Sequence, residues 1–139
     1  MPVTPAIIPC LRYRDAPAAI DFLCTAFGFT RRAVHTDTDP SIVAHAQLTL
    51  AGQMVMLASA TASDFARDAR LLTTAEAGGN TMTLYVVIDD VDGHCERARA
   101  AGADIFYEPT DQDYGGRTYG ARDPEGNVWS FGNYDPVAD

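Results

Sequence analysis

Residues 15–28 read DAPAAIDFLCTAFG and residues 90–102 read DVDGHCERARAAG, so each stretch opens with aspartate and closes with glycine. Aspartate is a favoured N-cap and glycine a favoured residue after the last turn, so both stretches are predicted to be capped helices. Three pairs of identical residues recur at a spacing of 74 or 75 residues: Asp15 and Asp90, Gly28 and Gly102, and Gly52 and Gly126. A fixed period of this kind predicts a module that occurs twice in the chain.

Strand-like runs flank both predicted helices in the same order, and a glycine turn joins the last two runs of each copy. The runs predicted to be strands are Ile7–Tyr13, Ala33–Thr36, Ile42–Leu50 and Gln53–Ala58, then Thr81–Ile88, Ile105–Tyr107, Arg117–Arg122 and Asn127–Phe131. Each copy therefore reads as a β-α-β-β-β module.

We predict one α+β domain over residues 1–139, with module one at 5–58, a linker at 59–80 and module two at 81–134. The strands of the two modules are expected to form a curved mixed sheet that encloses a concave pocket. The linker is rich in Ala, Ser, Thr and Gly, and a short helix is expected at Asp64–Thr73. A connection of this length is either a mobile tether or a functional arm.

Composition argues against several classes of protein. An apolar content of 47% with 21% charged residues is typical of a globular chain rather than a disordered one. The apolar runs are too short to span a bilayer, and the N-terminus lacks the sustained apolar core of a secretory signal. A net charge of −9 disfavours nucleic-acid binding. Three cysteines without CxxC spacing indicate reduced thiols, so we expect a cytoplasmic protein without a structural disulfide.

Three segments carry a resemblance to a known family. Leu11–Asp15 (LRYRD) precedes a helix that ends in Ala26–Phe29 (AFGF), and Asp123–Phe131 (DPEGNVWSF) closes the second module. These segments and the doubled module resemble the glyoxalase / bleomycin resistance / extradiol dioxygenase superfamily, also called vicinal oxygen chelate. The resemblance covers nearly the whole chain except the linker, and it implies a fold but no single activity.

In metal-dependent members, this resemblance implies ligands at the start of each module's first strand and in the middle of its last strand. The matching positions are Ile8, Thr83, Met56 and Ser130. None of them is a good ligand for a divalent cation. If the register at these positions is shifted by one or two residues, Cys10 is the single donor that becomes available, and His45 on an adjacent strand could be a second. The histidines show no HxH or HxxxH spacing. We therefore expect neither a metal nor another cofactor.

Alternation along the strands predicts which side chains share the concave face with these positions. The residues predicted to contact a ligand are Cys10, Arg12, Met54, Met56, Thr83, Tyr85 and Ser130 on the sheet, and Tyr114, Arg117 and Tyr119 in the loop at its mouth. An apolar basin with a few polar groups is the usual make-up of a small-molecule pocket. Structural alternatives stay open, because methionines can fill a sheet interior, Arg12 can pair with an acid, and the loop glycines can simply make a turn.

The same alternation places Trp129 and Phe131 on the opposite face, packed against the first helix through side chains such as Phe27. Asp123 and Glu125 are predicted to be turn residues rather than a catalytic carboxylate pair. The only tryptophan of the chain is therefore expected in the core and not against a ligand.

The preferred hypothesis is a homodimeric, metal-free small-molecule-binding protein similar to the bleomycin resistance branch, which sequesters its ligand without chemistry. The acidic charge and the apolar basin favour a cationic or aromatic ligand, and we expect neither a nucleic acid nor a membrane as partner. The competing hypothesis is an isomerase, lyase or dioxygenase of the same superfamily that uses a displaced metal or acid/base groups such as Tyr85 and Cys10. A regulatory or partner-binding module is the third hypothesis, although nothing resembles a DNA-reading helix with a basic face.

Overall fold

Both predicted helices form, and the predicted residues cap them. The computed structural model describes residues 1–138. Its two main helices are α1 (Ala16–Phe27) and α4 (Val91–Ala100). The Asp15 and Asp90 carboxylates accept backbone N–H groups of their own first turns at 3.1 and 3.0 Å. Gly28 follows α1 in the left-handed conformation with a φ of 87°. Because a cap satisfies backbone groups that the helix leaves free, these boundaries can be read from a few local residues.

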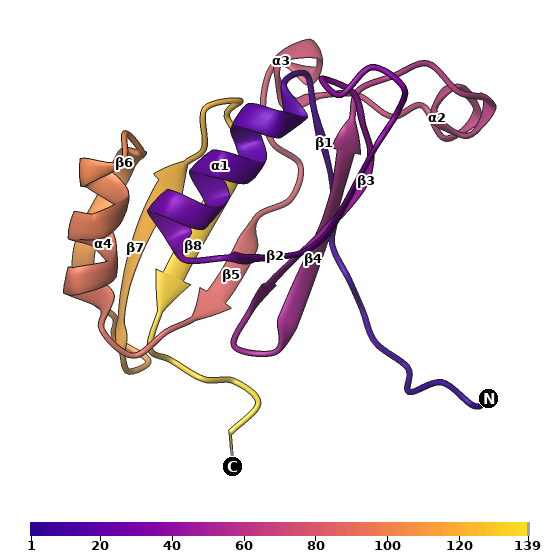
Figure 1. Ribbon diagram of the computed structural model, residues 1–139. Coiled ribbons are helices and arrows are strands. Elements are labelled where there is room, and N and C mark those ends of the chain that lie inside the picture. Colours follow the sequence, from indigo (N-terminus) through magenta and orange to yellow (C-terminus); the bar gives the residue numbers. More distant parts are fainter. Residues whose placement is uncertain (139) are drawn as a thin grey trace.

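The strands form two four-stranded sheets, one for each module (Figure 1). Sheet one has the order β1-β4-β3-β2 and sheet two the order β5-β8-β7-β6, with the first pair of each sheet parallel and the others antiparallel. The strands are β1 (Cys10–Tyr13), β2 (Thr30–Thr36), β3 (Val43–Leu50), β4 (Gln53–Ser59), β5 (Leu84–Val87), β6 (Asp104–Asp111), β7 (Arg117–Arg122) and β8 (Val128–Gly132). The α+β class and the doubled module are confirmed, but the strands make two sheets rather than one continuous sheet.

Strand lengths differ from the prediction where pairing decides them. β1 and β5 begin at Cys10 and Leu84, each three residues after the predicted starts at Ile7 and Thr81. β6 extends to Asp111 rather than ending at Tyr107, because Asp111 pairs with Arg117 across the hairpin. Strand length depends on the partner strand, which a pattern within one segment does not contain.

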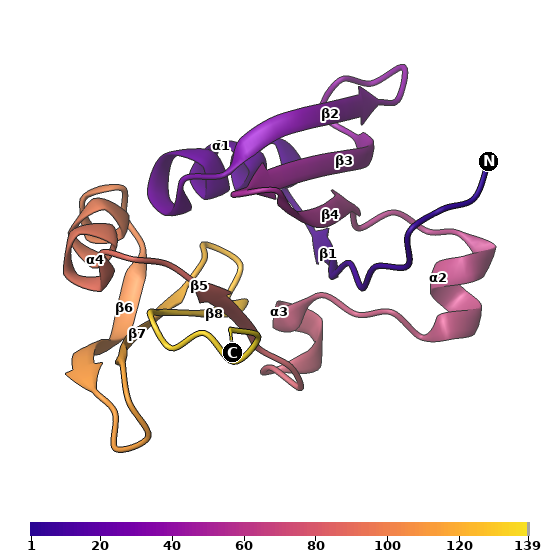
Figure 2. The ribbon, with the colours of Figure 1, turned by 90° about the horizontal axis from the view of Figure 1, so that it is seen from below.

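The linker contains two short helices instead of the single predicted one, α2 (Asp64–Ala69) and α3 (Thr74–Ala77). Arg70 adopts a left-handed conformation with a φ of 56°, which ends α2. Thr73 then caps α3 in a capping box with Glu76. Figure 2 shows α2 standing away from both sheets, on the same side as the N-terminal residues. No helix in residues 1–138 is long and apolar enough to cross a membrane.

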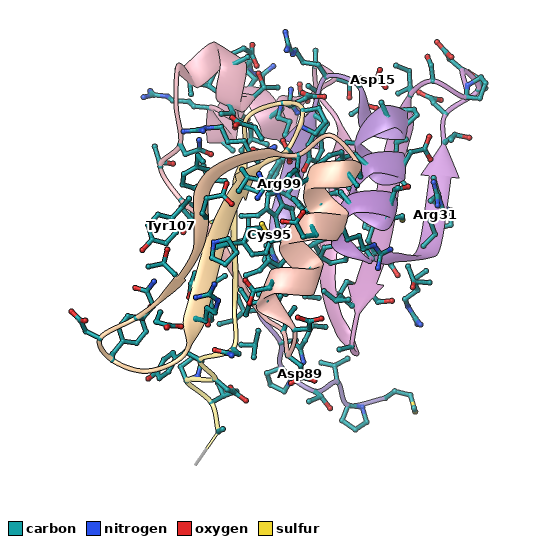
Figure 3. The ribbon with its side chains drawn as sticks, turned by 90° about the vertical axis from the view of Figure 1, so that its left-hand side faces the viewer. Asp15, Arg31, Asp89, Cys95, Arg99 and Tyr107 are labelled. Atoms are coloured by element: carbon teal, nitrogen blue, oxygen red, sulfur yellow. The ribbon has the colours of Figure 1, made fainter. Side chains whose placement is uncertain are left out.

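The two modules share one hydrophobic core. α1 packs on sheet one, α4 packs on sheet two, and the two helices contact each other side by side (Figure 3). Phe27 lies at the junction, with its ring centroid 5.4 Å from that of Trp129 and 4.7 Å from that of Phe131. All three side chains are fully buried, so the predicted core face of β8 is confirmed.

The turn between β7 and β8 joins the two modules by hydrogen bonds. Tyr13 of β1 donates its hydroxyl proton to the Asp123 carboxylate at 2.6 Å. The Glu125 carboxylate accepts the backbone N–H groups of Arg14 and Asp15 at 2.7 and 2.8 Å, next to the start of α1. Hydrogen bonds to an ionised group are the stronger kind, so this turn fixes module two against the entry to α1.

Candidate functional site

Each sheet has one face turned away from α1 and α4, which we call its open face. On sheet one, the register places Cys10 beside Met56, Met56 beside Gln47, and Gln47 beside Ala33, in one row across all four strands. Paired residues share a face and touch, so this row is continuous. Met54, two residues before Met56 on β4, lies on the same face. Arg12, two residues after Cys10 on β1, lies there too. Four predicted contact residues are therefore together on the open face of sheet one, namely Cys10, Arg12, Met54 and Met56.

Arg12 lies in the next row of the same open face, beside Ala58. Its Nη2 donates to the carbonyl oxygen of Thr61 at 3.1 Å, and its buried Nε has no hydrogen-bond partner. None of the ion pairs within residues 1–138 includes Arg12. A guanidinium that is partly buried without a carboxylate has spare donor capacity for a ligand oxygen.

On sheet two, the open face carries Tyr85 beside Ser130 and Ser130 beside Gly120. The Tyr85 hydroxyl donates to the carbonyl oxygen of Tyr134 at 2.6 Å. A Cβ at Gly132 would come within 2.7 Å of that hydroxyl oxygen, so the glycine leaves room for the tyrosine ring. Burial raises the pKa of Tyr85 above its usual value, which keeps the hydroxyl protonated and able to donate.

Three tyrosines gather around this end of sheet two, and we call Tyr85, Tyr114 and Tyr134 the tyrosine cluster. The rings of Tyr114 and Tyr134 meet edge to face with centroids 5.2 Å apart. The exposed fractions of the three residues are 39%, 63% and 41%. Large aromatic side chains are usually more deeply buried than this, so the cluster offers uncovered ring surface for stacking.

Two predicted loop residues have other partners. Arg117 is held by carboxylates, because its guanidinium forms ion pairs with Asp92 at 3.0 Å and Asp111 at 3.2 Å. Tyr119 is fully buried in the core beside Phe131, its partner on β8, so the expectation that it lines the pocket mouth is wrong. The error came from treating Tyr119 as part of the loop, whereas it is on β7 and follows the alternation of that strand.

A partly buried hydrogen-bond network around His94 was missed from the sequence. His94 Nε2 lies 2.9 Å from the carbonyl oxygen of Phe27, and Nδ1 lies 2.5 Å from the Tyr119 hydroxyl. A carbonyl only accepts, so the proton is on Nε2 and Tyr119 donates to Nδ1. Burial lowers the pKa of His94 and raises that of Tyr119, so both groups stay neutral. The network joins α4 to the end of α1 and is structural.

The four positions that the family resemblance assigns to a metal do not fit a divalent cation. The side chains there are Ile8, Thr83, Met56 and Ser130. Isoleucine has no donor atom, thioether sulfur suits soft metals, and neutral hydroxyls bind weakly. Ile8 and Thr83 also precede β1 and β5 rather than lying within them. Over residues 1–138, no group of three or more His, Cys, Asp and Glu side chains is placed to hold a metal.

Two cavities of the described residues lie elsewhere. One of about 360 Å³ is lined by Arg14, Asp15, Ala18, Ala19, Pro124 and Glu125. Another of about 240 Å³ lies beside α1 and β2, and its lining includes Ile20, Arg31 and Val43. Neither is lined by a predicted contact residue. The contact residues are instead divided between the open faces of two sheets, and no strand pairing joins those sheets within the described chain.

Comparison with known proteins agrees with this architecture. The sequence is 33% identical over 130 residues to an uncharacterised protein of Mycobacterium bovis, covering 94% of this chain and 84% of the relative. An uncharacterised protein of Mycobacterium tuberculosis is equally similar, and 75% of it is covered. The model of the Glyoxalase/Bleomycin resistance protein/Dioxygenase superfamily matches residues 6–131.

Solved structures show the same fold. TioX from Micromonospora sp. ML1 superposes with a TM-score of 0.68 at 30% identity, covering 95% of this chain and 100% of TioX. A glyoxalase/bleomycin resistance protein/dioxygenase family enzyme from Burkholderia phytofirmans PsJN superposes with a TM-score of 0.69 at 23% identity, covering 88% of this chain and 93% of that enzyme. With the matched family model and the doubled module, these similarities show that the chain belongs to the Glyoxalase/Bleomycin resistance protein/Dioxygenase superfamily.

Proposed function

We propose that this protein binds a small organic molecule on its open sheet faces, as a homodimer, and holds it without changing it chemically. The observation that carries the proposal is the tyrosine cluster, three partly uncovered rings around one end of sheet two. Ring faces and thioethers are the surfaces that bind planar apolar ligands. None of the predicted contact residues is a carboxylate or a histidine, which are the most common acid–base groups of enzymes.

A second copy of the chain completes the pocket in this proposal. The contact residues occupy two separate sheets, and neither of the two cavities described above includes them. β1 and β5 are also edge strands, and an unpaired strand edge is a ready surface for association. Two copies can bring the open face of sheet one in one chain against that of sheet two in the other. Analytical ultracentrifugation tests this step, and a monomer at micromolar concentration contradicts it.

The ligand chemistry follows from charge and surface. A net charge of −9 favours a cationic ligand, and the tyrosine cluster favours an aromatic one. Arg117 does not oppose a cation, because Asp92 and Asp111 already neutralise it. The same acidity disfavours nucleic acid, and we propose a reducing, cytoplasmic setting because all three cysteines are free thiols.

A ligand screen with a matched pair of variants tests the proposal. Thermal-shift measurements across cationic and aromatic metabolites should identify a compound that raises the melting temperature, and calorimetry should give its affinity. Tyr114→Ala should weaken that binding by roughly 2–10-fold, the loss expected for one aromatic contact. Phe65→Ala, at an exposed residue of α2, should leave affinity unchanged. Mass spectrometry should recover the ligand intact after incubation.

Two results would count against the proposal. The first is a broad screen in which no compound stabilises the protein. The second is conversion of a bound compound into a product at a catalytic rate, which would favour an isomerase, lyase or dioxygenase of the same superfamily.

A further inference from the structure

The β2–β3 hairpin places two imidazoles opposite each other on the open face of sheet one. His35 and His45 are direct cross-strand partners, and directly opposed residues have Cβ atoms only about 4.5–5.5 Å apart. Their ring centroids are 6.2 Å apart and their planes differ by 15°. We infer that His35 and His45 form a binding site for an imidazole-preferring divalent cation such as Zn²⁺ or Ni²⁺. The site lies on the same open face as the proposed ligand surface, but its test measures metal binding and does not depend on the organic ligand.

The ring separation is compatible with a shared ion. Metal–nitrogen bonds of about 2.0–2.1 Å let one ion link two imidazoles whose centres are at most roughly 6.4 Å apart, in the linear limit. The observed 6.2 Å lies inside that limit. The rings are stacked, so sharing an ion in a bent geometry requires them to turn their nitrogens toward each other and to approach by about 1 Å. His35 is exposed, so rotation of its side chain can provide this approach at little packing cost.

A third donor lies beside the pair. The side-chain amide of Gln47 is 3.1 Å from His45 Nε2, so it already approaches the nitrogen that would bind the ion. Exchange of the amide oxygen and nitrogen, which are nearly indistinguishable in shape, presents an oxygen ligand there. Water can occupy the remaining positions of a four-coordinate ion, as it does in open zinc sites.

The chemistry of the surroundings selects the class of metal. The open-face positions on the neighbouring strands, Arg12, Ala58, Cys10 and Met56, include no carboxylate, the ligand that Ca²⁺ and Mg²⁺ prefer. The acids that follow β2, Asp37 and Asp39, accept hydrogen bonds from Thr38 and Ser41 within their own turn. Imidazole ligands favour Zn, Ni and Cu. The net charge of −9 raises the local concentration of cations and offsets the repulsion from Arg12. The site is on β2 and β3, away from the four positions that the family resemblance assigns to a metal.

Titration of untagged, chelator-stripped protein with ZnCl₂, followed by calorimetry, tests the inference. We expect one saturable site, and His35→Ala and His45→Ala should each weaken it by at least about tenfold, as the loss of a ligand does. His35→Cys, which keeps a metal donor, should retain more affinity than His35→Ala. Cys10→Ser should bind Zn²⁺ as the native chain does, because the thiol is not part of the site.

Proton NMR with NiCl₂ gives a second readout within the same folded molecule. The chain has three histidines, so the ring signals of His35 and His45 should broaden while those of His94 persist, because both ring nitrogens of His94 are already in hydrogen bonds inside the protein. The inference is overturned if no saturable binding occurs up to about 1 mM metal, if either alanine variant binds like the native chain, or if Cys10→Ser abolishes binding. Far-UV circular dichroism confirms that each variant is folded.

Discussion

Replacing Asp123 by alanine tests the reasoning about how the two modules are held together. Asp123 is 4% exposed, and its carboxylate accepts hydrogen bonds from five donors. Two of them, the Tyr13 hydroxyl at 2.6 Å and Trp129 Nε1 at 3.2 Å, come from side chains that are fully buried. In the alanine variant these two donors lose their acceptor and have no access to water.

The magnitude follows from those two donors. Each unsatisfied buried donor costs about 1–3 kcal/mol, so the two together should lower the free energy of unfolding by about 2–6 kcal/mol, while the remaining donors, on Glu125 and Asn127, are partly hydrated. For a chain of this length that loss lowers the melting temperature by about 7–20 °C. Tyr13→Phe removes one donor, and the Asp123 carboxylate keeps its other four hydrogen bonds. The free energy of unfolding should therefore fall by only about 1–2 kcal/mol.

Urea unfolding measures these losses, with Trp129 fluorescence reporting the core and circular dichroism reporting the backbone. Asp104→Asn is the matched control, because its exposed ion pair with Arg122 should contribute less than about 1 kcal/mol. In the double variant, Tyr13→Phe should cost almost nothing further once Asp123 is absent. A loss below about 1 kcal/mol for Asp123→Ala would refute the view that this carboxylate fastens the modules.

Two further predictions concern the core and the open face. Burial lowers the pKa of His94 in the folded state, so the neutral imidazole contributes stability above the unfolded value of about 6.5 and loses it as pH falls through the folded pKa. Urea midpoints between pH 8 and 5 should fall less in His94→Gln than in the native chain, and equal slopes would argue against a buried neutral histidine. Gly132→Ala should lower stability by about 1–3 kcal/mol, because the new Cβ would lie 2.6 Å from Thr118 Oγ1 and 2.7 Å from the Tyr85 hydroxyl. Thermal unfolding measures this loss, and an unchanged midpoint would mean that the Tyr85 ring moves freely.

Local chemistry made much of the fold predictable. Caps and turns depend on a few consecutive residues, so Asp15 and Gly28 mark a helix before any contact is known. Alternation correctly separated the core residue Trp129 from its open-face neighbour Ser130, because successive side chains of a strand point to opposite faces. The family resemblance reached further than either pattern and is confirmed by the matched family model.

Other features depended on register and on pairing between strands. The division into two sheets follows from which strands find partners. The roles of Cys10, Arg12 and Met56 in binding a ligand stay predictions. Their presence on one open face is a structural fact that the pairing of β1 with β4 provides.

The sequence by itself determined that one capped module is repeated, because helix caps, glycine turns and strand alternation are local and recur at a fixed spacing. Only the tertiary structure decided what those modules bring together. His35 and His45 are ten residues apart with no metal-binding spacing, yet the register of β2 against β3 makes them direct neighbours. Asp123 looked like a turn residue, yet it accepts the hydroxyl of Tyr13 from the other module. The physical reason is the same in both cases, since hydrogen-bonded pairing and burial join residues whose separation along the chain carries no local signal.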